Sequence, residues 1–222
     1  NAAVKHNIPV AIFSLEMSKE QLVDRMLSAQ SQVDSWKLRT AKLSLDEEFE
    51  RLQNGMHELM KAPIYVDDTA ANSILNMRST LRRLHSDKPI GLVIVDYLQL
   101  MSTAKSYDSM VNQVTEISRS LKGLAKEFNV PVIALSQLSR AVEARGGKPR
   151  LSDLRDSGSI EQDADVVMFI HREDKYGENT DRKNIVEILI EKHRNGPTGM
   201  VELYFDDKKT SFLSIEKSEF GD

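Results

Sequence analysis

The sequence predicts an α/β fold in which a mainly parallel sheet is flanked by helices and antiparallel strands follow near the C-terminus. Apolar runs of strand length alternate with helical patterns through most of the chain. Strands connected by helices pair in parallel and are buried on both faces, so their side chains are apolar throughout each run. Beyond residue 184, runs of alternating character are separated only by short turns, as in antiparallel strands.

Five apolar runs are the expected strands of the first part of the chain, and helices are expected between them. The strands cover residues 8–15, 63–68, 91–96, 130–137 and 164–172, and helices are expected over 73–85 and about 109–128. Ser18 and Gln21 have the spacing of a capping box, in which each side chain bonds the other residue's backbone, so a helix is expected after Ser18. The stretch 138–159 is polar and rich in Arg, Gly and Ser, and residues 149–165 are expected to be a loop that leads into a short helix.

A second capping box, Ser44 with Glu47, opens a helix with one apolar stripe. The stripe consists of Leu45, Phe49, Leu52, Met56 and Leu59. Because these side chains share one helical face, we expect them to pack in the core or against another helix.

Three strands are expected to close the chain, and the first of them ends in a pair of cations. These strands cover 184–194, 199–205 and 211–215. Lys192 and Arg194 are two residues apart and therefore project from one face of the first strand. The side chains of Val186, Ile188 and Ile190 share that parity, so the face is expected to be buried first and cationic where the strand emerges. His193 points to the other face and is expected to be structural.

The composition describes one globular domain with a buried core. The chain has 222 residues, of which 40% are hydrophobic and 29% charged, and we expect a domain over residues 1–215 with a tail at 216–222. The absence of cysteine excludes disulfides and thiolate metal sites. No signal-peptide pattern opens the sequence and no apolar run approaches about 18 residues, so no membrane partner is expected, and the absence of cysteine fits a cytoplasmic protein. The net charge of −4 means that nucleic acid would have to bind a local surface.

Polar side chains that follow the predicted strands are the candidate functional residues, because ligands of parallel α/β sheets bind at the carboxyl ends of the strands. These residues are Glu16, Asp67, Asp68, Asp96, Gln137 and the pair Lys192 and Arg194.

Three of these residues suit the hydrolysis of a nucleoside triphosphate. Asp96 follows four apolar residues, and an acid at that place beside a phosphate-binding loop holds Mg²⁺, although such an acid also caps ordinary turns. Glu16 would then polarise the attacking water; the alternative is an exposed residue in the first turn of a helix. Gln137 would bond the terminal phosphate or the water, or else be a neutral amide at a strand end.

Two further stretches suit the binding of phosphate groups. Lys192 and Arg194 at a strand end suit a phosphate, with a solvated charged strand end as the alternative. Backbone amides around Gly158, together with Arg155, suit an anion such as a nucleic-acid phosphate, with a surface loop as the alternative. The motif G-x-x-x-x-G-K-S/T, which cradles phosphates, does not occur in the sequence.

Five stretches, in order along the chain, resemble the C-terminal ATPase domain of DnaB-type replicative DNA helicases. They are IFSLEMSKEQLVDRML, LVIVDYLQLM, VPVIALSQLSR, LSDLRDSGSIEQDADVVMFIHR and EKHRNGPTG. The resemblance implies a RecA-like P-loop NTPase core and an ATP-dependent DNA helicase that uses ATP and Mg²⁺. It also implies that the missing phosphate-binding loop and its strand lie upstream of Asn1, since NAAVKHN resembles the end of the helix that follows that loop.

The resemblance assigns roles to residues that match the family's motifs. It makes Glu16 the catalytic glutamate, Asp96 the Walker B acid for magnesium and Gln137 the sensor of the terminal phosphate. It makes Arg194, helped by Lys192, an arginine finger that reaches a nucleotide held by the adjacent subunit.

The same resemblance implies the partners. Arg155, Asp156 and Gly158 would lie in a central-channel loop that contacts single-stranded DNA, largely through backbone amides. The implied assembly is a homo-hexamer that moves 5′ to 3′ and meets a primase and a helicase loader. The alternatives are a RecA-like recombinase and, if the phosphate-binding loop is absent, a non-catalytic ring or loader-interacting module.

Overall fold

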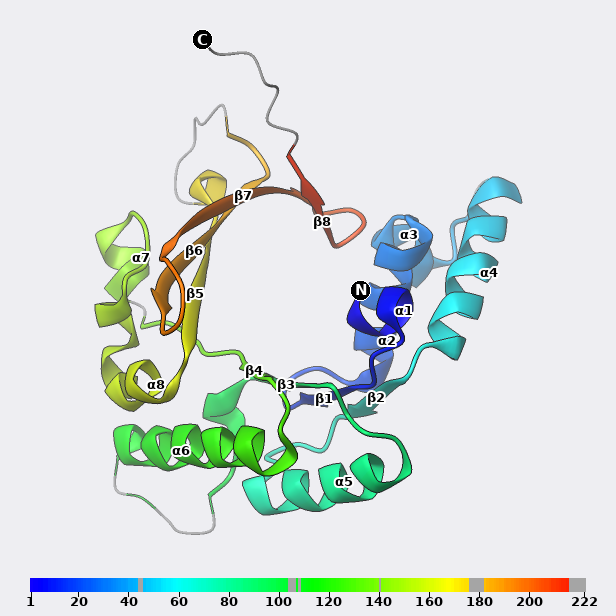
Figure 1. Cartoon of the computed structure of the whole chain (residues 1–222). Helices are drawn as coiled ribbons and strands as arrows, with labels where there is room; N and C mark the ends of the chain where they lie inside the picture. Colours follow the sequence, from blue (N-terminus) through cyan, green and yellow to red (C-terminus); the bar gives the residue numbers. More distant parts are fainter. Residues whose placement is uncertain (44–45, 104–106, 108, 140, 176–181, 216–222) are drawn as a thin grey trace.

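Two four-stranded sheets, one parallel and one antiparallel, form the framework of the protein (Figure 1). The computed structural model describes residues 1–43, 46–103, 107, 109–139, 141–175 and 182–215. The parallel sheet has the order β2-β1-β3-β4 and consists of β1 (Val10–Ser14), β2 (Ile64–Asp67), β3 (Leu92–Asp96) and β4 (Val132–Ala134). The antiparallel sheet has the order β5-β6-β7-β8 and consists of β5 (Val166–His171), β6 (Ile185–His193), β7 (Gly199–Asp206) and β8 (Ser211–Ser214). The predicted combination of helix-flanked parallel strands with antiparallel strands near the C-terminus is confirmed.

Helices connect the parallel strands, and two of them, one short and one of 3-10 type, lie in residues 149–165, where the sequence predicts a loop that leads into a short helix. They are α1 (Ala2–His6), α2 (Lys19–Ser31), α3 (Ser35–Thr40), α4 (Asp46–Lys61), α5 (Ile74–Asp87), η1 (Leu98–Leu100), α6 (Met110–Phe128), α7 (Ala141–Arg145), η2 (Leu151–Ser157), α8 (Gly158–Asp163) and η3 (Glu173–Lys175). The predicted box at the start of α2 is confirmed, because Gln21 N donates to Ser18 Oγ and Ser18 N donates to Gln21 Oε1. Ser44, of the second predicted box, lies outside the described residues.

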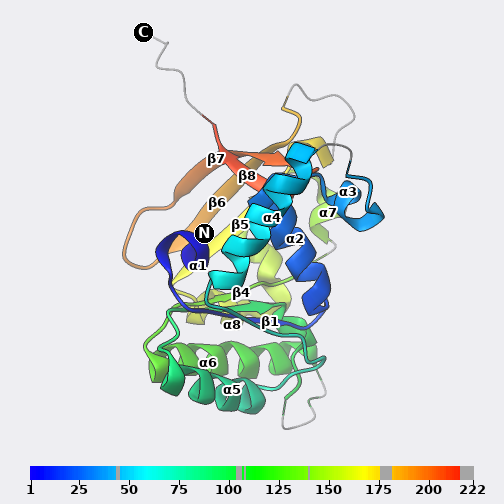
Figure 2. The same ribbon diagram turned by 90° about the vertical axis from the view of Figure 1, so that its right-hand side faces the viewer.

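The main core lies between the parallel sheet and the two helices α5 and α6, which run side by side below it in Figures 1 and 2. Val95 of β3, Met77 of α5 and Ile117 of α6 are each 0% exposed. The helices α2, α3 and α4 gather on the other side, near β1 and β2 (Figure 1). This packing fixes the positions of β1 and β3 and therefore of the residues that follow them.

The apolar stripe expected to be buried on α4 is buried only in part, since Leu52 and Leu59 are half-buried but two other residues are exposed. Phe49 and Met56 are 53% and 46% exposed. Instead α4 lies against α2 through Gly55, where a Cβ would come within 3.0 Å of Ser31. A glycine allows close approach of two helix backbones, and Phe49 and Met56 stay exposed beside this contact. Leu45 lies outside the described residues.

A β-bulge corrects the predicted faces of β6. Lys192 pairs with Val167 and Ile190 pairs with Met168, so Glu191 is an extra residue that shifts the register. Opposite residues of an antiparallel pair share a face, which places Lys192 on the face of Val167 and Leu189 rather than on that of Ile188 and Ile190. The predicted parity was therefore wrong from Lys192 onward.

The facing ends of the two sheets lie near each other. Leu138, shortly after β4, packs against a small core formed by Leu154 of η2, Val167 and Phe169 of β5, and Leu189 of β6. Both views show the start of β5 beside β4 (Figures 1 and 2). Within the described residues, β4 pairs only with β3 and β5 only with β6. Among all the residues that the structure describes, no helix is both long enough and apolar enough to cross a bilayer.

Candidate functional site

The ends of β1 and β3 bring Glu16 and Asp96 to the same edge of the parallel sheet. Ser14 is the register partner of Asp96, and Leu15 N donates to Asp96 O over 2.7 Å. Neighbouring strands are about 5 Å apart, so Glu16, two residues beyond Ser14, emerges close to Asp96. Glu16 is exposed and Asp96 half-buried, and neither carboxylate has a hydrogen bond or ion pair within the described residues. Both carboxylates can therefore accept a cation or a water.

Gln137 is held beside this edge by Gln99, a residue that sequence reasoning missed. The side-chain amide of Gln99 accepts from Gln137 N over 3.2 Å and donates to Gln137 O over 3.2 Å. The same amide donates to Ser136 Oγ over 3.0 Å. Because Gln99 lies in η1, three residues after Asp96, it links the end of β3 to the end of β4. The signal in the sequence was a polar residue inside the apolar run YLQLM.

Asp67 and Asp68, at the end of β2, are engaged in local structure. Asp67 accepts from Thr69 N over 3.0 Å and from Asn72 Nδ2 over 3.4 Å. Asp68 accepts from Lys19 N over 3.0 Å, and this bond from the start of α2 lowers the pKa of the Asp68 carboxyl. The two residues thus fasten the end of β2 and are not candidates for catalysis.

Lys192 and Arg194 lie on the antiparallel sheet, where both contact the end of α8. Lys192 Nζ donates to Glu161 O, and Arg194 Nη2 donates to Gln162 O over 3.4 Å. Arg194 Nη1 lies 3.1 Å from Asp165 Oδ1, and Lys122 of α6 donates to the other oxygen of that carboxylate. Lys122 first, and then Arg194, lower the pKa of Asp165. Asp165 is therefore a further residue of this site that the sequence did not reveal.

The segment expected to contact DNA lies at the junction of η2 and α8. The side chains of Arg155 and Asp156 lie outside the described residues, whereas Gly158 is exposed at the start of α8. Its φ of −53° suits any residue. A Cβ at Gly158 would meet no atom within 4 Å. Within the described chain, the glycine is therefore required by neither backbone conformation nor internal packing.

Asp153 stabilises the segment that connects Gln137 to η2, and the sequence did not predict this role. Its carboxylate forms a bidentate pair with Arg145, with both N–O distances 2.8 Å, and accepts from Arg150 N over 2.7 Å. The Asp153 carbonyl accepts from Ser139 N over 3.5 Å. The side chain is 7% exposed, and the bond from Arg145 lowers its pKa to about 2. Gly146 and Gly147 adopt φ values of 68° and 80° in the turn before η2, which favours glycine there.

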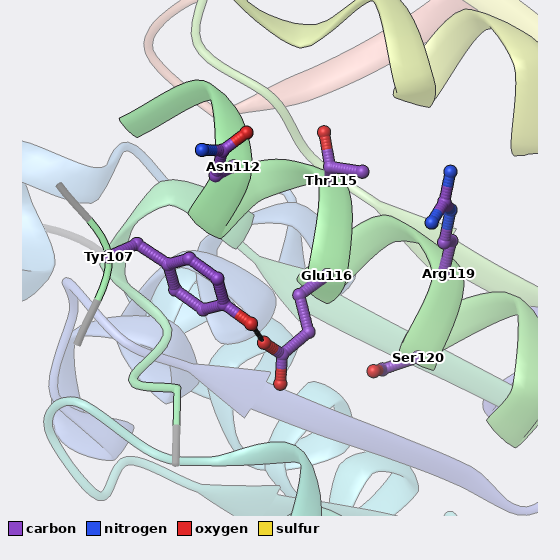
Figure 3. Close-up of a pocket in the computed structure, with 6 residues that line it drawn as sticks. All are labelled: Tyr107, Asn112, Thr115, Glu116, Arg119 and Ser120. Carbon is purple, nitrogen blue, oxygen red and sulfur yellow. Dashed lines mark hydrogen bonds between the residues drawn. The ribbon is translucent and has the colours of Figure 1, made fainter. Parts of the chain in front are cut away.

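Two surface hollows are lined by other residues than Glu16 and Asp96. Figure 3 shows the first, along α6, where the Tyr107 hydroxyl donates to the Glu116 carboxylate and Arg119 lies one turn further. The second follows the edge strand β2 and includes Asp67 and Asp68. Within the described ranges there is no group of three or more histidine and acidic side chains that could hold a metal ion. Asp96 alone could therefore supply only part of the oxygen ligands of a metal ion.

The sheet order and the carboxylates that follow β1 and β3 fit a RecA-like α/β domain. Solved structures agree with this class. One of them, described as an ATPase domain, superposes with a TM-score of 0.91 at 39% identity, covering 96% of this chain and 76% of that one. A DnaB-like replicative helicase, studied with its interactions with primase, superposes with a TM-score of 0.92 at 39% identity, covering 96% of this chain and 52% of that one. The RadB recombinase, at 15% identity and a TM-score of 0.52, shows the shared fold alone.

The chain belongs to the family of the DnaB-like helicase C terminal domain, whose model matches residues 1–214. It is 49% identical over 219 residues to the replicative DNA helicase DnaB of Geobacillus stearothermophilus, covering 98% of this chain and 48% of that protein. It is 48% identical over 219 residues to the replicative DNA helicase DnaC of Bacillus subtilis, with the same coverage of 98% and 48%. The chain thus spans about half the length of the curated relatives that it matches.

Proposed function

We propose that this chain is the motor domain of an ATP-dependent replicative DNA helicase. The domain would hydrolyse ATP at the subunit interfaces of a homo-hexamer and translocate 5′ to 3′ on single-stranded DNA, in the cytoplasm. The observation that carries the proposal is the pair of unengaged carboxylates, Glu16 and Asp96, at the joined ends of β1 and β3. The membership of the chain in the helicase family supports it.

One side of the nucleotide site would come from the parallel sheet. Asp96 would hold Mg²⁺, which characteristically takes one or two carboxylates and fills its remaining positions with waters and substrate phosphates. Glu16 would accept a proton from, or orient, the attacking water. Gln137, fixed through its backbone by Gln99, would face the terminal phosphate. When bound, Mg²⁺ would neutralise charge on the phosphates.

The other side would come from the adjacent subunit. Arg194 is 51% exposed, so its guanidinium can reach beyond its own chain, and Lys192 lies two residues earlier. An arginine can donate two parallel hydrogen bonds to a phosphate, where it would stabilise the charge that develops during hydrolysis.

The strand and phosphate-binding loop that complete the site would lie between β4 and β5, contributed by residues outside 1–222. Each of these strands has one unpaired edge within the described residues. Apolar side chains are exposed on both, with Ile133 44%, Met168 54% and Ile170 65% exposed. An inserted strand would satisfy the backbone groups of both edges, and its flanking helix would cover apolar surface.

The junction of η2 and α8 would contact the phosphate backbone of single-stranded DNA through Arg155, Asp156 and Gly158. The absence of an internal need for glycine at Gly158 supports this role, because a side chain there would keep another molecule from the backbone amides. Backbone contacts carry no sequence information, as a translocating motor requires. A primase and a helicase loader are the proposed protein partners; a similar solved helicase was described with its interactions with primase.

The test is hydrolysis by the full-length protein with Glu16→Gln, a change that keeps the size of the side chain. ATP binding should persist while single-stranded DNA-stimulated hydrolysis is lost, as measured by nucleotide binding and phosphate release. Undiminished turnover would remove Glu16 from the mechanism. The action of Arg194 in trans is tested by mixing Arg194→Ala with Glu16→Gln subunits. Mixed rings contain some interfaces with both residues intact, so hydrolysis should partly recover, and no recovery would refute the finger assignment.

The recombinase alternative has weaker support. The similarity to RadB is confined to the fold, at 15% identity, whereas the helicase family model matches residues 1–214. A non-catalytic ring would be indicated only if the full-length protein failed to bind ATP.

A further inference from the structure

The short helix α8 has a proposed functional residue at each end. It begins at Gly158, in the segment proposed to contact DNA, and its last turn supplies the carbonyls of Glu161 and Gln162 to Lys192 and Arg194. Asp165 follows the helix and pairs with Arg194 at 3.1 Å. The helix also packs on α6 through Ile160, and the Asp163 carboxylate accepts from Ser118 Oγ over 2.8 Å. The two functional segments are thus joined by six residues of continuous helix.

The contacts hold the guanidinium of Arg194 without occupying it fully. Nη1 faces Asp165 and Nη2 faces Gln162 O, at 3.1 and 3.4 Å respectively. A guanidinium has five N–H donors, so this arrangement leaves donors for a phosphate. Two cations, Lys122 and Arg194, pair with the one carboxylate of Asp165, so that carboxylate does not neutralise Arg194 alone.

The ion pair between Arg194 and Asp165 is also weak enough to rearrange. Arg194 and Asp165 are 51% and 50% exposed, and exposed ion pairs contribute little to stability. A contact of this kind can orient a side chain in the absence of a ligand and still yield when a phosphate arrives. A deeply buried pair could not do so without leaving an unpaired charge.

We propose that Asp165 is a positioning residue for Arg194, which it holds against α8 so that engagement of DNA at the start of the helix also places the finger at its end. This inference rests on the proposed function of both segments. DNA that displaces the first residues of α8 would move the carbonyls of Glu161 and Gln162 and, with them, the guanidinium. Stimulation of hydrolysis by DNA would follow from this shared support.

The experiment is a double-mutant cycle in the full-length protein with Asp165→Asn and Arg194→Ala. Asp165→Asn keeps the shape of the side chain and removes the charge that orients Arg194. We expect kcat in the presence of single-stranded DNA to fall roughly 10- to 100-fold, with little change in KM for ATP, because misplacing a group costs mainly transition-state stabilisation. The ratio of kcat with DNA to kcat without DNA should also fall.

The cycle separates positioning from a general structural effect. In the Arg194→Ala background, Asp165→Asn should change kcat by less than about twofold, because its only route to the reaction has been removed. The matched control is Glu127→Gln, since Glu127 is an acid of α6 that also pairs with two cations, Arg78 and Arg82, but these cations belong to α5 and not to this cluster. Glu127→Gln should leave kcat unchanged. Light scattering verifies that each variant forms the same assembly.

Either of two results would overturn the proposal: an undiminished kcat in Asp165→Asn, or the same loss with and without Arg194. If Asp165→Asn assembles poorly, Asp165→Glu replaces it, since it retains the charge and alters only the reach. The loss of kcat in Asp165→Glu must be smaller than the loss in Arg194→Ala. In the Arg194→Ala background, Asp165→Glu must cause no further loss of kcat. An Arg194→Ala protein with full activity would instead refute the finger itself, so the failure of the proposed function is recognised separately.

Discussion

Removal of the negative charge of Asp153 should weaken both the fold and the link between Gln137 and η2. Asp153→Asn keeps the shape of the side chain but loses the charge that binds Arg145 in a bidentate pair at 2.8 Å. It also weakens the bond from Arg150 N, 2.7 Å from Oδ2.

The magnitude follows from the pKa of Asp153, which is lowered from 3.8 to about 2. A difference of nearly two units at about 1.36 kcal/mol per unit gives an upper bound of roughly 2.5 kcal/mol for the stabilisation by the charged form. Arg145 is 41% exposed, so solvent screens the pair and about 1–2 kcal/mol is expected at pH 7. Because the folded pKa is depressed, this stabilisation is complete above the unfolded value of 3.8 and is lost as the pH falls through about 2.

Urea denaturation of wild-type and Asp153→Asn protein, followed between neutral pH and pH 3, measures the difference in unfolding free energy. The difference should be constant above about pH 5 and should narrow below about pH 4, because only the wild type has a carboxylate at position 153 that can be protonated. A difference that stays the same throughout would show that the charge of Asp153 is not its source. In the full-length protein, the same variant should reduce the stimulation of hydrolysis by single-stranded DNA.

Two further changes test contacts elsewhere in the chain. Gln99→Ala should lower kcat for ATP hydrolysis roughly 10-fold, because the backbone of Gln137 loses the side-chain amide that holds it. The control is Gln113→Ala, which removes a hydrogen bond to Met101 O. Equal kcat values in the two variants would refute this role of Gln99. Gly55→Ala should destabilise the fold by about 1 kcal/mol, because the new Cβ would lie 3.0 Å from Ser31 backbone and side-chain atoms and outweigh the gain in helix propensity. Gly123→Ala is the control, because its Cβ would meet no atom within 4 Å, and it should stabilise the fold by about 0.5–1 kcal/mol, measured by thermal denaturation. A Gly55→Ala protein that is more stable than the wild type would contradict the packing argument.

The features that the sequence predicted correctly are those that depend on neighbouring residues. The capping box at Ser18 and Gln21 and the apolar run before Asp96 are local patterns with local causes, and the structure has the corresponding helix and strand. The strand order then follows from packing, and it brings the ends of β1 and β3 together as the strand-end argument expected. The catalytic roles of Glu16 and Asp96 stay predictions.

The features that escaped prediction depend on contacts between distant segments. The bulge at Glu191 changes the face of Lys192, and nothing in the alternation of β6 signals an extra residue. Asp153 and Asp165 read as ordinary polar residues until Arg145 and Arg194 are seen beside them. Phe49 and Met56 belong to a stripe with the periodicity of a buried face, but the close contact of α4 with α2 is made at Gly55, and these two side chains stay exposed.

The unpaired edges of β4 and β5 have a practical consequence for the handling of residues 1–222 by themselves. Within the described residues, each edge presents a row of backbone donors and acceptors, flanked by exposed isoleucine and methionine side chains. A strand of another molecule can pair with such an edge, and that molecule can be a second copy of this chain. Preparations of residues 1–222 by themselves are therefore expected to precipitate or to form open-ended polymers. An added peptide whose side-chain pattern suits the gap between the two edges should keep them in solution.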